Sequence, residues 1–383
     1  MNCPRPGQPK PYGRIHDKLQ LSESLIDDVP SLRRNLGCDD PIGNWQDVAG
    51  DIDVYQLKSC IPQDDRIAFY TPSKNECGQQ YDALTYRELH TEFEQCPRFP
   101  AGSNVAIVIP VEQMAEMAMA LLSTIAAGAV AVPLDPRMSA TRILEAMQQL
   151  QCNSLIAPES ILLEKNLFEK TSDELYVVHP SLLESADVEA GPSSFFLNGV
   201  HDVRIILGGR CGRLSWTVLN KTSIGEASWK PSVITHQDSD RNDMSPGSPA
   251  MLLRTSGTTS TPKVVPISHS MLVYGAISIA AALQLQRQDC NANTMPFYHI
   301  GGISCNLLAV LVSGGSVLFA GPLTDPNSFL DHLIDQPKED GDLVPVPTWY
   351  YAGPSMHKAI VLMAEAKWNS SKDLFWRNRK GSL

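Results

Sequence analysis

The sequence predicts an α/β fold in which mostly parallel sheets are flanked by helices. Continuous apolar runs rich in β-branched residues lie at 105–109, 129–134 and 154–157, and each run has the length of a buried strand. Helical stretches at 112–127 and 142–151 lie between these runs. Because a strand, helix, strand order joins parallel strands, this alternation indicates an α/β domain.

Size, charge and cysteine content limit the classes of function. The chain has 383 residues, of which 43% are hydrophobic and 19% charged, and this suits a soluble globular protein. Its formal net charge of −11 argues against nucleic acid as the main partner, because phosphate backbones bind basic surfaces. The nine cysteines include no CxxC pair and indicate free thiols in a reducing compartment.

Membrane insertion and secretion are not expected. The N-terminal segment lacks the apolar core of a signal peptide, so we expect an intracellular protein. The uncharged stretch Met117–Leu134 reaches the length of about 18 residues that a membrane helix needs. Gly128 and Pro133 interrupt this stretch, so a helix followed by a buried strand is the better prediction.

Several parts of the chain are predicted to be irregular or to turn. Residues 1–60 are expected to form an irregular lead-in without chemistry. A short strand is predicted at 66–70, followed by a polar turn at 73–80. A further strand is expected at 203–207 and a turn at 208–213, whose glycine pair is a poor dinucleotide motif because no helix follows it.

Helix boundaries are marked by specific residues. Thr85 is a candidate N-cap for a helix that opens at 84–89, and Glu88 would complete a capping box. Gly128 is expected to end one helix, and Ser139 to start the next. Beyond residue 260, we expect helices at 268–286 and 307–312, a turn into a strand at 314–319, and a last helix that continues to about residue 366.

The most informative segment is Thr255–Lys263, which follows the apolar run Pro249–Leu253. It contains six hydroxyl side chains, one glycine and one lysine within nine residues. Gly257 allows backbone N–H groups to approach an anion, the hydroxyls donate hydrogen bonds, and Lys263 supplies a positive charge. The segment is therefore a candidate phosphate-binding loop, and a polar surface loop is the alternative interpretation.

A nucleotide-binding P-loop is excluded by the residues around the lysine. That motif requires glycine directly before the lysine and serine or threonine directly after it. In this sequence Pro262 precedes Lys263 and Val264 follows it. A P-loop kinase or GTPase is thus not expected.

The loop TSGTTSTPKV resembles the phosphate-binding signature of the adenylate-forming superfamily, which includes acyl-CoA synthetases, luciferases and peptide-synthetase adenylation domains. Ser260 and Val264 stand where that signature has glycine, and Ser260 is a variant of oxalate–CoA ligase-like members. The segments LTYRELH, AGAVAVPLDPR, PFYHIGG and PTWYYAGPSMH resemble further segments of the family. The resemblance covers residues 60–366.

The resemblance implies binding of ATP, with Mg²⁺, and of coenzyme A as co-substrate, together with a small carboxylic acid. Lys263 would be the catalytic residue, and the hydroxyl of Thr258 would contact the metal. The residues that would bind ATP are Thr255, Ser256, Gly257, Thr258, Thr259, Ser260, Thr261 and Lys263. Because family members include peroxisomal enzymes, the resemblance implies a cytoplasmic or peroxisomal location. The last residues, Lys380–Leu383, do not form the Ser-Lys-Leu peroxisomal signal.

The acid pocket implied by the resemblance includes His299, Gly301, Gly302, Tyr351 and His357. The residues themselves offer partial support, because His299 is expected to end an aromatic strand and the glycine pair permits close approach of a ligand. A histidine satisfied within a core or loop is the alternative.

No segment after Lys263 matches the family motifs for adenine, ribose, the hinge or the C-terminal lysine. The sequence is therefore expected to hold residues 61–366 of a partial AMP-binding N-terminal domain, a divergent tail at 367–383, and no C-terminal lid domain. The predicted function is ATP-dependent activation of a carboxylic acid, with small dicarboxylates among the candidates, to an acyl-adenylate and then an acyl-CoA, impaired by truncation. The alternative is an inactive fragment that binds nucleotide or a partner.

Overall fold

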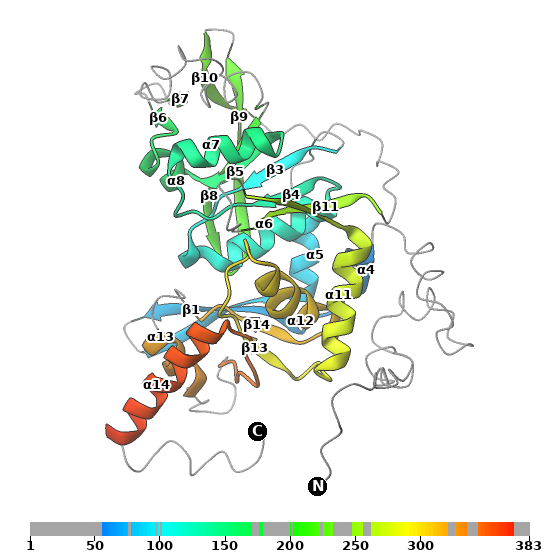
Figure 1. Ribbon diagram of the computed structural model, residues 1–383, viewed down its shortest axis with the longest axis vertical. Helices are drawn as coiled ribbons and strands as arrows, with labels where there is room; N and C mark the ends of the chain where they lie inside the picture. The colour runs from blue at the N-terminus through cyan, green and yellow to red at the C-terminus, as the bar shows by residue number, and fades with distance from the viewer. Residues whose placement is uncertain are drawn as a thin grey trace, which may run out of the picture.

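Helices and two β-sheets alternate in layers (Figure 1). The computed structural model describes residues 56–75, 78–95, 99, 102–170, 176–178, 200, 202–222, 225–232, 247–255, 262–320, 326–334 and 344–370. Within these residues the strands form one sheet of ten strands and one of four. The fold class predicted from the sequence is thus confirmed.

The large sheet is parallel at its centre and antiparallel at both sides. In spatial order its strands are β12 (Val264–Ser268), β11 (Pro249–Arg254), β4 (Val130–Pro133), β3 (Asn104–Ile107), β5 (Cys152–Pro158), β8 (Asp202–Arg210), β9 (Arg213–Thr222), β10 (Gly225–Ser232), β7 (Tyr176–Val178) and β6 (Phe168–Lys170). The strands from β11 to β8 are parallel to their neighbours. Their carboxyl ends therefore meet at one edge of the sheet, which we call the carboxyl edge.

The small sheet has the strand order β13–β14–β1–β2. Its strands are β13 (Cys290–Ala292), β14 (Ser316–Leu318), β1 (Ile67–Asn75) and β2 (Gly78–Thr85). The first three strands are parallel, and β2 pairs antiparallel with β1. Chain segments more than 200 residues apart thus build one sheet.

The helices fill the space between the sheets and cover their outer faces (Figure 1). They are α4 (Gln56–Cys60), α5 (Tyr86–Gln95), the 3₁₀ turn η2 (Val111–Gln113), α6 (Met114–Ala126), α7 (Ala140–Gln149), α8 (Glu159–Glu164), α11 (His269–Ala282), the π-helix η4 (Gly302–Leu308), α12 (Ala309–Ser313), α13 (Pro326–Ile334) and α14 (Pro354–Ser370). Side chains of α5, α6, α11, η4 and α12 form the core between the sheets. Those of α7 and α8 cover the far face of the large sheet, and α13 and α14 cover that of the small sheet.

The predicted helix boundaries in the N-terminal half are confirmed. The backbone N of Thr85 donates to Oε2 of Glu88 at 2.8 Å, and the backbone N of Glu88 donates to Oγ1 of Thr85 at 3.2 Å, which completes the capping box. Ser139 caps α7 by accepting from the backbone N of Arg142. Gly128 follows α6 with a φ of +80°, a conformation that suits glycine.

Three segments differ from the sequence-based expectation. Residues 73–75 and 78–80 belong to strands β1 and β2 rather than to a polar turn. Gly208 and Gly209 continue β8, and the chain turns only at Cys211 and Gly212. The lead-in ends in the short helix α4. In each strand the antiparallel partner supplies hydrogen bonds that an apolar pattern does not reveal.

The apolar stretch from Met117 to Leu134 is divided between α6, β4 and the residues that join them, as predicted. In the described part of the chain, every helix is too short or too polar to span a membrane.

The turn between β8 and β9 connects the two sheets. The thiol of Cys211 lies 3.5 Å from the carbonyl oxygen of Phe69 and 3.3 Å from that of Asp82, on β1 and β2. Gly212 has a φ of +83°, and a Cβ at this position would lie 3.2 Å from the ring of Phe69. The turn therefore needs a glycine and fits closely against the small sheet.

Charged side chains reinforce this connection. Nη2 of Arg213 donates to the carbonyl oxygen of Ala83 at 3.0 Å and to Oε1 of Glu88 at 2.6 Å. The backbone N of Gly212 donates to Oε1 of the buried Glu116 on α6 at 3.5 Å. Burial raises the pKa of Glu116, and the hydrogen bond from Gly212 opposes this effect in part.

We predict that Glu116→Gln stabilises the protein near neutral pH. Because the pKa of Glu116 is higher in the folded protein than its ordinary value, the folded state binds the proton more tightly than the unfolded chain. This contribution to stability is complete below about pH 4 and is lost as the pH rises. Glutamine retains the acceptor oxygen without the ionisation, so the gain in unfolding temperature should grow from acid to neutral pH.

Thermal unfolding at a series of pH values measures this effect. The exposed Glu112, four residues earlier on η2, provides the control, because Glu112→Gln removes a carboxylate that is already in solvent and should leave the pH profile unchanged. A profile for Glu116→Gln that runs parallel to that of the parent protein would contradict the prediction.

Candidate functional site

The two ends of the hydroxyl-rich segment meet at the carboxyl edge. β11 and β12 form an antiparallel pair that aligns Arg254 with Val264. Beyond this pair, the backbone N of Thr255 donates to the carbonyl oxygen of Lys263 at 2.9 Å. Thr255 and Lys263 are both exposed, so the pairing holds the ends of the loop together and leaves both side chains accessible. Residues 256–261, which include Ser256, Gly257, Thr258, Thr259, Ser260 and Thr261, lie outside the described residues.

The neighbouring strand β4 ends at the same level. Met251 of β11 pairs in parallel with Ala131 of β4, and Thr255 and Asp135 each follow four residues further on, just beyond the ends of these strands. Adjacent strands are about 4.8 Å apart, so the loop and the segment that follows β4 both begin at the carboxyl edge, one strand apart. The end of the loop is also held by α7, because Nε2 of Gln149 donates to the carbonyl oxygen of Pro262 at 3.2 Å.

Asp135 and Arg137 form an ion pair at this edge. Nε of Arg137 donates to Oδ1 of Asp135 at 3.0 Å, and Nη2 donates to Oδ2 at 2.8 Å. Burial alone would raise the pKa of Asp135, but the hydrogen bonds from Arg137 outweigh it and the pKa lies below its ordinary value. The carboxylate is therefore ionised at neutral pH and fixes the guanidinium.

This ion pair contacts the segment that contains His299. The guanidinium carbon of Arg137 lies 5.9 Å from the ring centre of Tyr298, a cation–π distance. The rings of Tyr298 and His299 follow with centres 4.9 Å apart, and His299 also interacts electrostatically with Asp135. The carboxyl edge thus brings together the ends of the loop, an ion pair and an exposed imidazole.

The glycine pair serves the packing of the chain itself. A Cβ on Gly302 would lie only 2.5 Å from the carbonyl oxygen of Pro296, and a Cβ on Gly301 would lie 2.9 Å from the ring of Tyr351. The backbone around Gly302 therefore requires glycine, whereas a side chain at Gly301 would displace the ring of Tyr351. His299 precedes the helix that includes these glycines, and it lies in a bend rather than at the end of a strand as we had expected. Tertiary contacts, and not strand pairing, hold this aromatic segment.

Tyr351 is held by its backbone and presents its ring at the surface. Its carbonyl oxygen accepts hydrogen bonds from Oγ1 of Thr294 and, at 3.2 Å, from Nδ2 of Asn306. Its side chain is 42% exposed and lies over Gly301. The structure therefore places Tyr351 next to the segment that begins at His299.

His357 has different surroundings. Its Nδ1 is hydrogen-bonded to the hydroxyl of Tyr350 at 2.7 Å, and the ring of Tyr350 packs edge-on against Phe329. These contacts belong to the core between the small sheet and α13–α14. The structure thus groups His299, Gly301, Gly302 and Tyr351, whereas His357 faces its own aromatic partner.

Two groups of site residues escaped the sequence analysis. Asp135 and Arg137 belong to the segment AGAVAVPLDPR, to which no site residue was assigned, although their position directly after a buried parallel strand is a signal for a site. The buried amides of Asn293 and Asn306 carried no such signal, because they are separated along the chain and meet only through folding.

The described residues offer limited means of holding a metal. Among them, no group of three or more His, Cys, Asp or Glu side chains could bind a metal ion. The predicted magnesium contact, Thr258, lies outside the described part.

The described residues thus form two sheets with helices on both faces, and the two ends of the hydroxyl-rich segment meet at the carboxyl edge. Residues 60–374 match the family model described as AMP-binding enzyme. The chain belongs to this family, as the resemblance of its motifs predicted.

Curated relatives support this membership. The acyl-CoA synthetase FUM10 of Gibberella moniliformis is 26% identical over 266 residues, which make up 68% of this chain and 40% of the relative. The oxalate–CoA ligase of Saccharomyces cerevisiae is 41% identical over 85 residues, which make up 22% of this chain and 16% of the relative. The chain spans about half or less of the length of the relatives it matches.

Solved structures agree with the fold. MatB from Rhodopseudomonas palustris aligns with 81% of this chain and 51% of its own length, with a TM-score of 0.54, in a structure without ligand and in one with ATP bound. The sequence identities are 17% and 18%, so this likeness establishes a shared fold.

We predict that Gly302→Ala destabilises the protein by about 1–3 kcal/mol, because the added methyl group would be forced against the carbonyl oxygen of Pro296. Gly275→Ala on α11 is the matched control, since a Cβ there meets nothing within 4 Å and alanine favours a helix by about 0.5–1 kcal/mol. Urea unfolding should therefore give opposite signs for the two variants. A Gly302→Ala protein as stable as the parent would show that the packing around His299 is looser than described.

Proposed function

We propose that this protein activates a carboxylic acid with ATP, as an acid–CoA ligase. The observation that supports this most strongly is the common location of the base of the loop, the Asp135–Arg137 pair and His299 at the carboxyl edge. Ligands of open α/β sheets bind at this edge. Membership of the AMP-binding family makes a nucleotide the expected ligand.

In the proposed reaction, a carboxylate oxygen of the acid attacks the α-phosphorus of ATP, and pyrophosphate leaves. The thiol of coenzyme A then attacks the acyl carbon, and AMP is released. The first step requires alignment of two anions and compensation for the charge of the leaving pyrophosphate. Lys263, together with the N–H and hydroxyl groups of Thr255 and the following loop residues, would hold the phosphates and supply this compensation.

Mg²⁺, when bound, would neutralise phosphate charge and would be contacted by the hydroxyl of Thr258. The exposed imidazole of His299 and the ring of Tyr351 would form one side of the acid pocket, with His357 further away beside Tyr350. Short acids, including small dicarboxylates, are the proposed substrates. This choice rests on Ser260, on the Pro347–His357 segment and on the similarity to oxalate–CoA ligases.

A second proposal is nucleotide binding without turnover. It rests on the residues described at the carboxyl edge, where Lys263 and Arg137 offer positive charge for the binding of an anion. Binding and exchange assays separate the two proposals.

We predict that Lys263→Ala weakens ATP binding by about ten- to a hundred-fold, because a charge-assisted hydrogen bond contributes about 1.5–3 kcal/mol. Isothermal titration calorimetry measures the affinity. Lys358→Ala, which removes an exposed lysine on α14, is the control and should bind ATP as the parent does. An unaltered affinity of Lys263→Ala would mean that the loop does not bind the phosphates.

Acid-dependent exchange of radiolabelled pyrophosphate into ATP tests turnover directly. Exchange above background with oxalate or malonate supports the ligase, whereas ATP binding without exchange supports the second proposal. Absence of both would contradict both.

If exchange occurs, His299→Ala should raise the KM for the acid by about ten-fold and leave ATP affinity unchanged, because the imidazole would lie on the acid side of the site. His357→Ala should have a smaller effect, since that ring is bonded to Tyr350. If His357→Ala raised the KM for the acid more than His299→Ala, the acid pocket would lie beside α14 instead.

A further inference from the structure

Polar side chains gather on the inner face of the small sheet, below Tyr351. Asn291 on β13 and Asn306 on η4 are completely buried, and Asn293 is 3% exposed. Nδ2 of Asn306 donates to Oδ1 of Asn293 at 3.0 Å and to the carbonyl oxygen of Tyr351 at 3.2 Å. These bonds connect the end of β13, the π-helix and the segment that carries Tyr351.

Several atoms of this group retain unused hydrogen-bonding capacity. Both side-chain amide atoms of Asn291, Oδ1 of Asn306 and Nε1 of Trp349 are buried without a hydrogen-bond partner among the described residues. Two of these atoms are donors and two are acceptors. Buried polar atoms are nearly always paired, so four such atoms in one region require an explanation.

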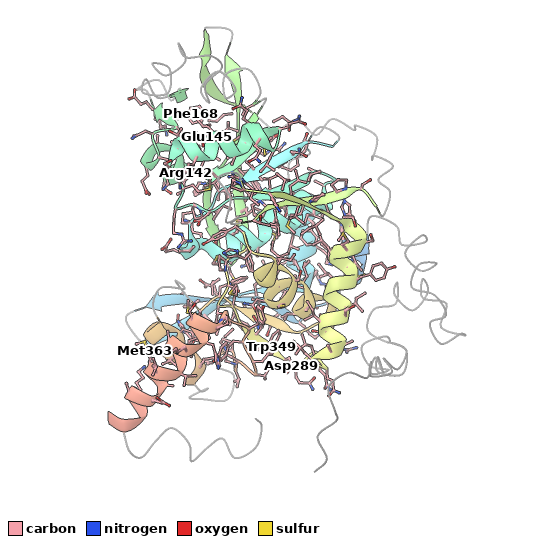
Figure 2. The ribbon with its side chains drawn as sticks, in the orientation of Figure 1. Arg142, Glu145, Phe168, Asp289, Trp349 and Met363 are labelled. Carbon is pink, nitrogen blue, oxygen red and sulfur yellow. The ribbon has the colours of Figure 1, made fainter. Side chains whose placement is uncertain are left out.

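The register of the sheet places these atoms on one face. Asn291 pairs with Val317 of β14 and with Trp349 on its other side, and residues in parallel register point to the same face. Val317 belongs to the core between the sheets, against which Trp349 also packs. Figure 2 shows Trp349 beside the small sheet. Asn293, two residues after Asn291, continues the ladder by donating its backbone N to Leu318 and therefore faces the same way.

The π-helix brings Asn306 to this face. Its Nδ2 is bonded to Asn293, so its free Oδ1 lies within the same group. A π-helix of this kind is rare and often marks a functional position in a protein. Its wide turn begins at Gly302, where the carbonyl oxygen of Pro296 leaves no room for a Cβ.

The chemistry of the four atoms defines what they would bind. A leucine at position 291 would have the same number of side-chain heavy atoms in the same branched shape, without the cost of burying an amide. Donors and acceptors without a counter-charge suit a neutral group that both donates and accepts, since an ion buried there would be unpaired. A hydroxyl or a water molecule has these properties and a fitting size.

We propose that Asn291, Asn306 and Trp349 form an internal binding site for a small uncharged hydrogen-bonding guest. The guest is either an ordered water molecule or the hydroxyl group of a bound acid; the second source rests on the proposed function. The guest connects β13 to η4 and to Trp349. By fixing Asn306, the guest also fixes the carbonyl oxygen of Tyr351, to which Asn306 donates. The position of the Tyr351 ring at the surface depends on this bond.

A crystal structure of the full chain, at a resolution that shows water, tests the site. We expect a density peak within about 2.7–3.2 Å of an amide atom of Asn291. Crystals soaked in glycolate and in acetate, which differ by one hydroxyl, identify the source. If the peak is the same in glycolate and in acetate, the guest is water. If the hydroxyl of glycolate replaces the peak and acetate leaves it unchanged, the site binds the hydroxyl of the acid. Absence of a peak in all crystals would overturn the proposal.

Thermal unfolding of Asn291→Leu provides a test that needs no ligand and no activity. With a guest bound, the variant loses its hydrogen bonds, and we expect the midpoint temperature to fall by about 2 °C or more. Asn104→Leu is the reference for a bonded amide, because Nδ2 of Asn104 donates to the carbonyl oxygen of Leu150 at 2.7 Å. If Asn291→Leu unfolds at the same or a higher temperature than the parent, the amide is unpaired in solution and the proposal is wrong.

Discussion

The parallel pairing of β11 with β4 is the constraint on which the arrangement of the site depends. This pairing fixes Met251 opposite Ala131, and the chain then leaves both strands at Thr255 and Asp135. One strand leads into the hydroxyl-rich segment, and the other leads to Arg137 and through it to Tyr298 and His299. A shift of the register by one residue would move these side chains to the other face of the sheet and separate the groups.

The connection between the two sheets gives this edge a rigid support. The turn at Cys211 and Gly212 fits against β1 and β2, and Arg213 is bonded to Glu88, the residue that also caps α5. The core between the sheets therefore holds the large sheet, which carries the loop, and the small sheet, which carries the segment of His299. The proposed function requires both halves of the site, one for the phosphates and one for the acid.

The sequence predicted elements that are defined by local signals. The capping box at Thr85 and Glu88, the stop at Gly128 and the buried parallel strands follow from interactions within a few residues. Strands held by antiparallel partners were missed, such as residues 73–75 and Gly208–Gly209, because their hydrogen bonds come from segments that local patterns do not identify. The bend at His299 was taken for the end of a strand because its aromatic residues are held by tertiary contacts, which local patterns also do not identify.

The sequence alone determined the class of the protein, because a long motif of hydroxyl residues, proline and lysine is specific in its order and needs no tertiary context to be recognised. It also determined the α/β architecture, since periodicity reflects which residues are buried. Only the tertiary structure decided which residues share the edge: it joined Arg137 to Tyr298, placed Tyr351 on Gly301 and gave His357 to Tyr350. Contacts between distant segments depend on register and packing, and these are properties of the whole fold.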